Sequence, residues 1–349
     1  MELFYNIYFP IILVFFTGIS IKLFIIILNY FKIFDIPNKR SNHILPTPKG
    51  VGLILSIYIF GSVILFITYG KIHNELLKEI VLMMLALSIF SFFDDLYSIS
   101  FLKKLFFQSF IVFLSIYFLD NKVNEFCYTI YNKQIWKINF DSFQILVQVF
   151  IFLFWMWVIN LFNFMDGIDG MTATQVITFC IGMIFLATQK QIDEDFSYLG
   201  IIIFSVFLSF FYYNKPPAKI FLGDSGSTSI GFLIAYVIIL TILEQKNFVS
   251  LIILILYHLS DTTYTLAKRI IKKKNIFSAH SEHFYQQKIR KGFSHANVLN
   301  KIFSINLLLA LFSLIYYRSP ILSIILSILM VIYLLKWLGN QKKKINADK

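Results

Sequence analysis

Long apolar runs recur from one end of this chain to the other, and hydrophobic residues make up 58% of it. A helix of about 20 apolar residues crosses a hydrocarbon core of about 30 Å. Only helices and closed barrels satisfy their backbone polar groups inside lipid. The sequence therefore predicts an all-α polytopic membrane protein, a single domain over 1–349, with about eleven transmembrane helices. They fall near 7–31, 51–69, 77–93, 105–119, 144–163, 172–188, 197–213, 227–243, 248–267, 298–316 and 320–338.

Lysine and arginine concentrate in alternate connections between these runs, and such connections face the cytoplasm. The basic set comprises the loops 32–50, 94–104, 164–171, 214–226 and 268–297 and the C-terminal tail 339–349. We therefore expect the N-terminus outside and the C-terminus in the cytoplasm. The first run lacks a basic leader and a small-residue cleavage site, so we expect a retained helix.

The formal net charge is +12, which in a membrane chain favours anionic lipid headgroups and anionic substrates as partners, not nucleic acid. The longest outer connection, 120–142, is rich in aromatic and β-branched residues around Asn132 and Lys133. This composition predicts a small β-hairpin on the outer surface.

Acidic residues are rare, yet several stand in short blocks at the ends of apolar runs. Only 19 Asp and Glu occur, and the blocks are FFDDLYSIS (92–100), NLFNFMDGIDGM (160–171) and FLGDSGS (221–227). Carboxylates at the edge of a bilayer are costly unless a cation or a reaction requires them. All three blocks fall on the predicted cytoplasmic side. Together they predict a divalent-metal site that faces water.

Asp94 and Asp95 have two readings. Adjacent acids can simply end a helix at the membrane interface. Alternatively, one carboxylate serves a metal or a basic partner while the other acts as a base, because successive side chains point in different directions.

The second block places Asn160 and Asn163 on one face of a helix end, and follows Asp166 and Asp169 each with a glycine. Glycine permits close backbone approach, and Mg²⁺ usually takes one or two carboxylates together with phosphate oxygens and waters. A polar helix-capping turn is the alternative. A calcium loop is disfavoured because the ligand spacing of an EF-hand is absent.

Asp224 precedes small residues that open the eighth run. It suits a helix N-cap, and the same helix start offers free N–H groups to an anion such as phosphate. Phe221 could stack on a nucleobase, although most of the 41 phenylalanines fill the membrane.

The loop after the ninth run carries His280 and His283 among many lysines and arginines. No third close ligand completes a zinc site. A cationic or donor-rich lobe that grips a diphosphate is the simpler reading, and a solvated basic loop is the alternative. Asp261 and Lys22 lie inside apolar runs, where an ionisable residue suggests function, although Lys22 could snorkel to the interface.

In their order and spacing, these blocks and DIPNKRSNHILPTPKGVG (35–52) resemble the polyprenyl-phosphate N-acetylhexosamine-1-phosphate transferases, of the glycosyltransferase family 4 type. The resemblance covers about 35–298. SDTTYTLAKRI and AHSEHFYQQ are similar to the branch that initiates O-antigen and other surface polysaccharides. The peptidoglycan branch has three consecutive histidines in the corresponding loop.

The resemblance implies a bacterial inner-membrane enzyme that transfers a sugar-1-phosphate from a UDP-sugar to undecaprenyl phosphate and releases UMP. The sugar would be an N-acetylhexosamine or its 6-deoxy relative, the cofactor Mg²⁺ or Mn²⁺ in its place, and the assembly a homodimer. The implied catalytic residues are Asp94, Asp95 and Asp224, with Asp224 and Asn160 at the metal. The implied substrate-binding residues are Thr47, Asn160, Asn163, Asp166, Asp169, Phe221, Arg269, His280 and His283.

A transporter or flippase of polyprenyl-linked sugars is the alternative from another class. Transporters usually place their charges near the membrane midplane, in broken helices of repeated halves. Here the charges crowd one rim of the membrane, which favours the transferase.

Overall fold

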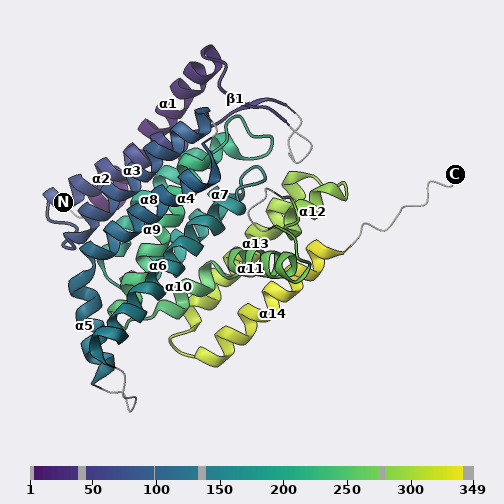
Figure 1. Cartoon of the computed structure of the whole chain (residues 1–349). Helices are drawn as coiled ribbons and strands as arrows, with labels where there is room; N and C mark the ends of the chain where they lie inside the picture. Colours follow the sequence, from purple (N-terminus) through teal and green to yellow (C-terminus); the bar gives the residue numbers. More distant parts are fainter. Residues whose placement is uncertain (1–3, 38–44, 98, 133–138, 276–279, 341–349) are drawn as a thin grey trace.

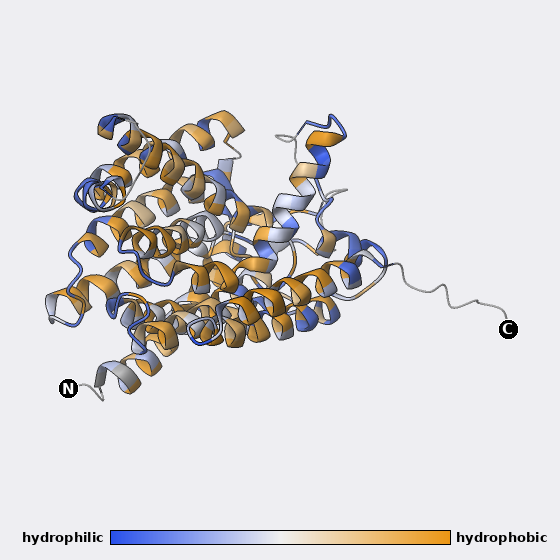
Figure 2. Ribbon diagram, turned by 90° about the horizontal axis from the view of Figure 1, so that it is seen from below, coloured by the Kyte–Doolittle hydropathy of each residue, from blue (hydrophilic) through white to orange (hydrophobic). Residues whose placement is uncertain are grey.

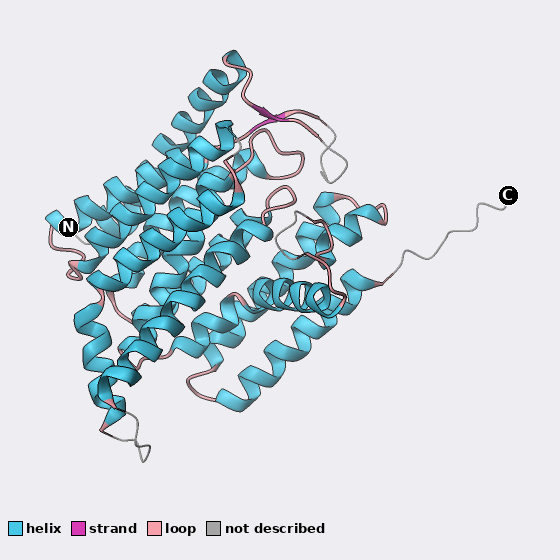
Figure 3. Cartoon of the chain, viewed as in Figure 1, coloured by secondary structure: helices cyan, strands magenta, loops and turns pink. Residues whose placement is uncertain are grey.

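The computed structural model describes residues 4–37, 45–97, 99–132, 139–275 and 280–340. Helices make up 78% of this part of the chain, and the strands form one short pair (Figure 3). Hydrophobic residues dominate along most helices and hydrophilic ones gather in the connecting segments (Figure 2). The prediction of an all-α polytopic membrane protein is confirmed.

All eleven predicted runs are helical. Within the described ranges, nine helices are long and apolar enough to span a membrane. One bent pair is either a tenth, broken span or a re-entrant loop, and α2 is shorter, with 17 residues. The helices, most of them labelled in Figure 1, are α1 (Phe9–Tyr30), α2 (Gly52–Thr68), α3 (Leu76–Tyr97), α4 (Phe101–Phe118), α5 (Asp120–Tyr131), α6 (Phe140–Phe164), α7 (Met171–Thr188), α8 (Asp195–Asn214), α9 (Asp224–Leu243), α10 (Phe248–Leu254), α11 (Leu256–Ile271), α12 (Phe284–Arg290), α13 (His295–Ile315) and α14 (Pro320–Gly339).

The ninth predicted span is not one straight helix. It breaks at Ile255 into α10 and α11, which meet at 70°. The Gln175 side chain donates to the Leu254 carbonyl over 2.8 Å, and Asn306 donates to Gln175 over 2.8 Å. These bonds satisfy a carbonyl that the break would otherwise leave unpaired in an apolar interior.

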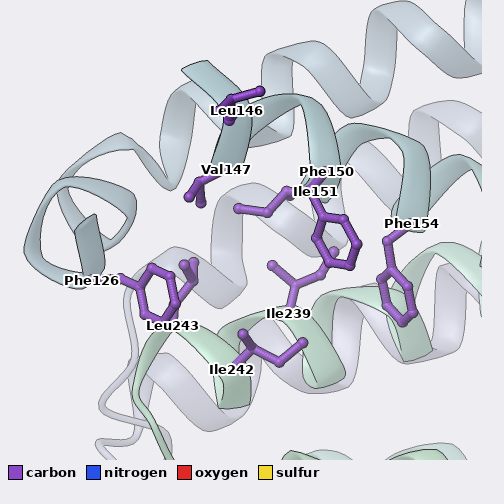
Figure 4. Close-up of a pocket in the computed structure, with 9 residues that line it drawn as sticks. All are labelled: Phe126, Leu146, Val147, Phe150, Ile151, Phe154, Ile239, Ile242 and Leu243. Atoms are coloured by element: carbon purple, nitrogen blue, oxygen red, sulfur yellow. The ribbon is translucent and has the colours of Figure 1, made fainter. Parts of the chain in front are cut away.

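The predicted outer β-hairpin is wrong, because residues 120–131 form helix α5; residues 133–138 lie outside the described part. Val123 and Cys127, four positions apart, are both buried, which is the spacing of one helical face. Together with α6 and α9, α5 encloses an apolar cavity of about 260 Å³, which includes Phe126 among its lining side chains (Figure 4).

Helix α9 runs through the centre of the bundle, and 94% of its most apolar 18-residue stretch is buried. It packs against α3 and α6 and, at its start, against α2. A side chain at Gly52 would overlap the backbone of Gly226, so only glycine allows α2 and α9 to meet this closely. The start of α9 is thereby fixed at one end of the bundle.

The short pair joins β1 (Phe34–Asp35) to β2 (Thr47–Pro48) in antiparallel register. The chain beyond β2 is bonded to the segment before α9. The Phe221 N–H donates to the Pro48 carbonyl over 2.8 Å, and the Gly50 N–H donates to the Phe221 carbonyl over 3.2 Å. These backbone hydrogen bonds hold the 47–52 segment beside the start of α9.

Candidate active site

The three predicted catalytic carboxylates meet at one end of the bundle, and we call Asp94, Asp95 and Asp224 the carboxylate cluster. Asp94 and Asp95 come from the end of α3, and Asp224 from the start of α9. Lys104 of α4 contacts Asp94 and lies 3.1 Å from Asp224 Oδ2 through its Nζ. Asn163 of α6 donates to Asp224 Oδ1 over 3.0 Å. One ammonium group therefore lies between two of the carboxylates.

Asp95 holds the start of α9 in place. Its buried carboxylate accepts the backbone N–H groups of Asp224 over 3.1 Å and of Ser225 over 3.2 Å. A side chain at Gly223, which has φ of +77°, would overlap this carboxylate. Free N–H groups at a helix start attract a negative charge. Asp95 therefore positions Asp224, a role distinct from that of Asp94.

A cavity of about 860 Å³ adjoins the carboxylate cluster. Lys104 and Asn163, which contact Asp224, are among the residues that line it. The remaining lining side chains are of two kinds, polar and apolar. They are Asn160, Asp166, His280, His283 and Gln286, and Ile99, Phe101, Leu105, Leu153, Met156, Trp157, Phe164 and Leu266. The space suits a ligand with a polar head and an apolar tail.

Asp166 faces this cavity from the turn after α6. Its Oδ1 accepts the Thr172 hydroxyl over 2.6 Å. Burial raises the pKa of Asp166 to about 7, and the bond from Thr172 works against this rise. The group is thus poised between its two charge states near neutral pH.

His283 is oriented by a carboxylate from within the membrane region. Its Nδ1 lies 3.2 Å from Asp261 Oδ1, and this same oxygen accepts the Phe284 N–H over 3.1 Å. Tyr257 and Thr265 also donate to Asp261. With Nδ1 engaged by Asp261, Nε2 is the ring atom that remains for a ligand.

His280 is the second histidine on the cavity wall. Burial lowers its pKa to about 4, and the neighbouring His283 adds to this effect. His280 is therefore neutral at physiological pH, so its ring can form hydrogen bonds but carries no charge.

Two predicted ligand residues contact neighbouring protein segments. Asp169 accepts the Ala218 N–H over 3.1 Å and lies 3.2 Å from His295 Nδ1. The Thr47 hydroxyl donates to the Leu45 carbonyl over 3.1 Å. Neither is among the residues that line the large cavity, and their roles toward a substrate stay predictions.

Arg269 and Phe221 likewise lie outside the cavity wall. Arg269 forms bonds of 2.6 Å to Glu282 Oε1 and to the Asn275 carbonyl, which tie α11 to the loop that follows. The Phe221 backbone bonds to the 48–50 segment, as described above. Stacking of Phe221 on uracil also stays a prediction.

The sequence reading missed Lys104. It lies ten positions after Asp94, beyond the turn between α3 and α4. It is one of many lysines in the basic connections, and in the sequence it indicated only that the 94–104 loop faces the cytoplasm. Ser227 was also missed. Its hydroxyl lies 3.1 Å from Asn163 Nδ2, and it follows Asp224 by three positions, close to one helical turn. Its spacing from Asp224 on the helix was the available signal.

The donor atoms available at the cluster are oxygens. Within the described residues, no group of three or more His, Cys, Asp or Glu side chains could hold a metal ion. This excludes a protein-only cage there but fits Mg²⁺, which completes its shell with waters and substrate phosphates. Asn160 donates its amide N–H to the Met156 carbonyl over 2.8 Å, which leaves its Oδ1 for a cation or a ligand.

The sequence model of glycosyl transferase family 4 matches residues 77–242. This stretch holds all three carboxylates of the cluster, together with Lys104 and Asn163. This central part of the chain is similar to glycosyl transferase family 4. The matched part ends before α11 and the histidines, so the family match rests on the carboxylate side of the site.

Curated relatives extend the similarity. A phospho-N-acetylmuramoyl-pentapeptide-transferase of Prochlorococcus marinus (strain MIT 9312) is 28% identical over 292 residues, which cover 77% of this chain and 77% of the relative. A probable undecaprenyl-phosphate N-acetylglucosaminyl 1-phosphate transferase of Bacillus subtilis (strain 168) is 26% identical over 214 residues, 57% of this chain and 59% of the relative. Both relatives are transferases of sugar phosphates by name, and they differ in the sugar.

Proposed function

We propose that this protein transfers a sugar-1-phosphate from a UDP-sugar to undecaprenyl phosphate and releases UMP. The main support is the arrangement of Asp94, Lys104, Asn163 and Asp224 beside a cavity that is lined by both polar and apolar side chains. The family match covers these four residues. The names of both relatives described above support the same reaction class.

The cavity offers separate surroundings for the two substrates. Leu105, Leu153, Trp157 and Leu266 would contact the first isoprene units of the acceptor. The polar side chains of Asn160, Asp166, His280 and Gln286 would hold the diphosphate and the sugar. Because the two substrates would meet between these side chains, the protein would contribute mainly by positioning them.

In the proposed step, a phosphate oxygen of the lipid attacks the β-phosphorus of the UDP-sugar. The bond from that phosphorus to the bridging oxygen breaks, and UMP leaves with the bridging oxygen. Asp94 would accept the proton from any lipid phosphate that is still protonated. Lys104 would hold Asp94 in place and offset negative charge on the transferred group.

We propose Mg²⁺ as the cofactor, with Mn²⁺ able to take its place, held by Asp224 and the amide oxygen of Asn160. When bound, the cation would neutralise charge on the diphosphate. Asn163 would orient Asp224 toward it, and Asp95 would fix the start of α9 on which Asp224 stands.

We further propose that the polymer initiated is an O-antigen or another surface polysaccharide. His280 and His283 are separated by Ser281 and Glu282, and Glu282 pairs with Arg269 and Lys274. This differs from the run of three histidines in the peptidoglycan branch. The sugar would then be an N-acetylhexosamine or a 6-deoxy relative, in a bacterial inner membrane with the carboxylate cluster toward the cytoplasm. A homodimer is part of the same proposal.

The test is UMP release by purified protein with undecaprenyl phosphate and Mg²⁺. Separate reactions receive UDP-N-acetylglucosamine, UDP-N-acetylfucosamine, UDP-N-acetylquinovosamine or UDP-N-acetylmuramoyl pentapeptide. We expect lipid-dependent release with one of the first three. Release with the pentapeptide alone would contradict the surface-polysaccharide assignment. No release in any reaction from folded protein would contradict these substrates, and nucleotide-independent transport of a polyprenyl-linked sugar would favour the flippase.

A further inference from the structure

A third cavity lies between α1 and α8, apart from the carboxylate cluster. Its volume is about 540 Å³, and it shares no lining residue with the large cavity. Its walls are residues of α1 from Val14 to Lys22 and residues from Leu208 to Lys215 at the end of α8. Phe15 and Lys22 are exposed on the outer surface of the bundle, where lipid would surround them.

The two walls are held at a fixed distance. The Tyr213 hydroxyl donates to the Gly18 carbonyl over 3.1 Å, and a side-chain carbon on Gly18 would lie 3.1 Å from Ser209 Oγ. The lining residues of α1 span eight positions on one helical face, or about 12 Å along the axis. The cavity is therefore an elongated groove with a defined width.

Both lysines lie toward the same end of this groove. The chain after α1 and the chain after α8 meet where Lys49 bridges to Phe221, so the two helices run in the same direction. Lys22 is the last lining residue of α1, and Lys215 follows α8 directly. Figure 1 shows α1 projecting past its neighbours at the end that leads to β1. Gly18 lies beside Ser209 and Tyr213, so Lys22, one turn further along α1, lies toward the end of α8. Both cations thus face the membrane surface that carries the carboxylate cluster.

The groove combines positive charge with an apolar wall. No Asp or Glu is among the described residues that line it, and the Lys215 Nζ lies 5.0 Å from the centre of the Tyr212 ring. A cation within an apolar span is costly unless it reaches headgroups or meets an anion. Basic pockets between transmembrane helices commonly hold anionic lipid headgroups.

We propose that this groove binds one anionic phospholipid of the adjoining leaflet. Its phosphate would lie between Lys22 and Lys215, and one acyl chain would lie along Val14, Phe15 and Ile19. A free phosphate would gain nothing from the apolar wall, and a zwitterionic lipid would gain less from the lysines. The proposal is independent of the transfer reaction, since the groove shares no residue with the active site.

Native mass spectrometry of the full-length protein in detergent tests this site. Phosphatidylglycerol and phosphatidylcholine with identical acyl chains are titrated against wild-type protein and the double variant Lys22→Gln, Lys215→Gln. The matched control is Lys272→Gln, an exposed lysine after α11 that lines neither cavity. We expect the affinity for phosphatidylglycerol to fall roughly 30-fold in the double variant, about fivefold for each lysine. Phosphatidylcholine binding and the control should not change.

Further variants and competitors fix the occupant. Phe15→Ala should weaken the binding of both lipids equally, because it removes an apolar lining side chain of the groove and leaves its charge unchanged. Equal phosphatidylglycerol binding by wild type and double variant, or an equal loss in Lys272→Gln, would overturn the site. Displacement by inorganic phosphate would show a soluble-anion site instead. If the two lysines affect only undecaprenyl phosphate binding, the phospholipid assignment is wrong. All lysines concerned are exposed, and unchanged UMP release would confirm that each variant is folded.

Discussion

The carboxylate cluster and the histidine segment (280–295) both adjoin one cavity but are held in different ways. The cluster stands on the ends of long helices, and α9 is almost wholly buried. The histidine segment depends on specific side-chain bonds to α11 and α14. Asp261 contacts His283 at 3.2 Å, and the buried Lys288 donates to the Trp337 carbonyl over 2.7 Å. We therefore expect the carboxylate cluster to be rigid. The histidine segment should lose its substrate-binding geometry when a single one of these bonds is removed.

The largest effect is expected at the reacting centre, from Asp224→Asn. The change removes the charge that would hold the metal, while the amide keeps the shape of the side chain. Turnover should fall by about 10²–10³-fold or more. The measurement is UMP release across a Mg²⁺ series. Asp141→Asn, an exposed acid in the first turn of α6, is the matched control and should keep full activity. Wild-type turnover in Asp224→Asn at saturating Mg²⁺ would refute the metal assignment.

Lys104→Met should have the second largest effect. Without the ammonium group, Asp94 and Asp224 repel each other across the space that Lys104 now fills. We expect turnover to fall on the order of a hundredfold, together with a lower melting temperature. Adding Asp94→Asn removes the repulsion and should restore the melting temperature but not the turnover. Loss of stability equal to the sum of the two single changes would show that the groups do not interact.

Asp261→Asn tests the histidine segment, because Asp261 contacts His283. The amide cannot attract His283 as a carboxylate does, so the imidazole should lose its fixed orientation. We expect the KM for the UDP-sugar to rise roughly tenfold to a hundredfold while kcat changes less. Thr265→Val removes a different bond to Asp261 and should have a smaller effect on KM. An unchanged KM in Asp261→Asn, or a fall in kcat as large as the rise in KM, would contradict the proposed difference between the carboxylate cluster and the histidine segment.

The smallest effect concerns His280 and pH. Because burial holds its pKa near 4 in the folded protein, below the usual value near 6.5, the unfolded chain binds more protons between these values. His280 therefore favours unfolding as the pH falls through that window, and stability rises with pH across it. His280→Gln should flatten this part of the stability curve, measured by thermal unfolding from pH 4.5 to 7. A wild-type slope in the variant would show that His280 is not held neutral.

The sequence predicted the grouping of the carboxylates because the ends of apolar runs share one side of a membrane. Asp94, Asp95 and Asp224 fall at such ends, so topology alone brings them near each other. It could not predict that Asp95 faces the start of α9 or that Lys104 stands between Asp94 and Asp224. Both facts depend on how helices rotate and pack, which hydropathy does not record.

The misread elements have similar causes. The bend at Ile255 occurs within an unbroken apolar run, and its stabilising partner Gln175 comes from another helix. Residues 120–131 have strand-like composition, but Val123 and Cys127 fall on one helical face that packs against the bundle. In both cases a long-range contact decided the structure over local preference.

In the proposed reaction, the β-phosphorus of the nucleotide sugar moves to the lipid at the carboxylate cluster. The direct measurement uses the UDP-sugar that supports UMP release, labelled with ³²P at the β-phosphate, and follows the label into the lipid extract. We predict label in the lipid with wild type and Asp141→Asn, and labelling slower by about 10²–10³-fold or more with Asp224→Asn. Label that stays in the aqueous phase while the sugar enters the lipid would show transfer of the sugar alone and would contradict the account.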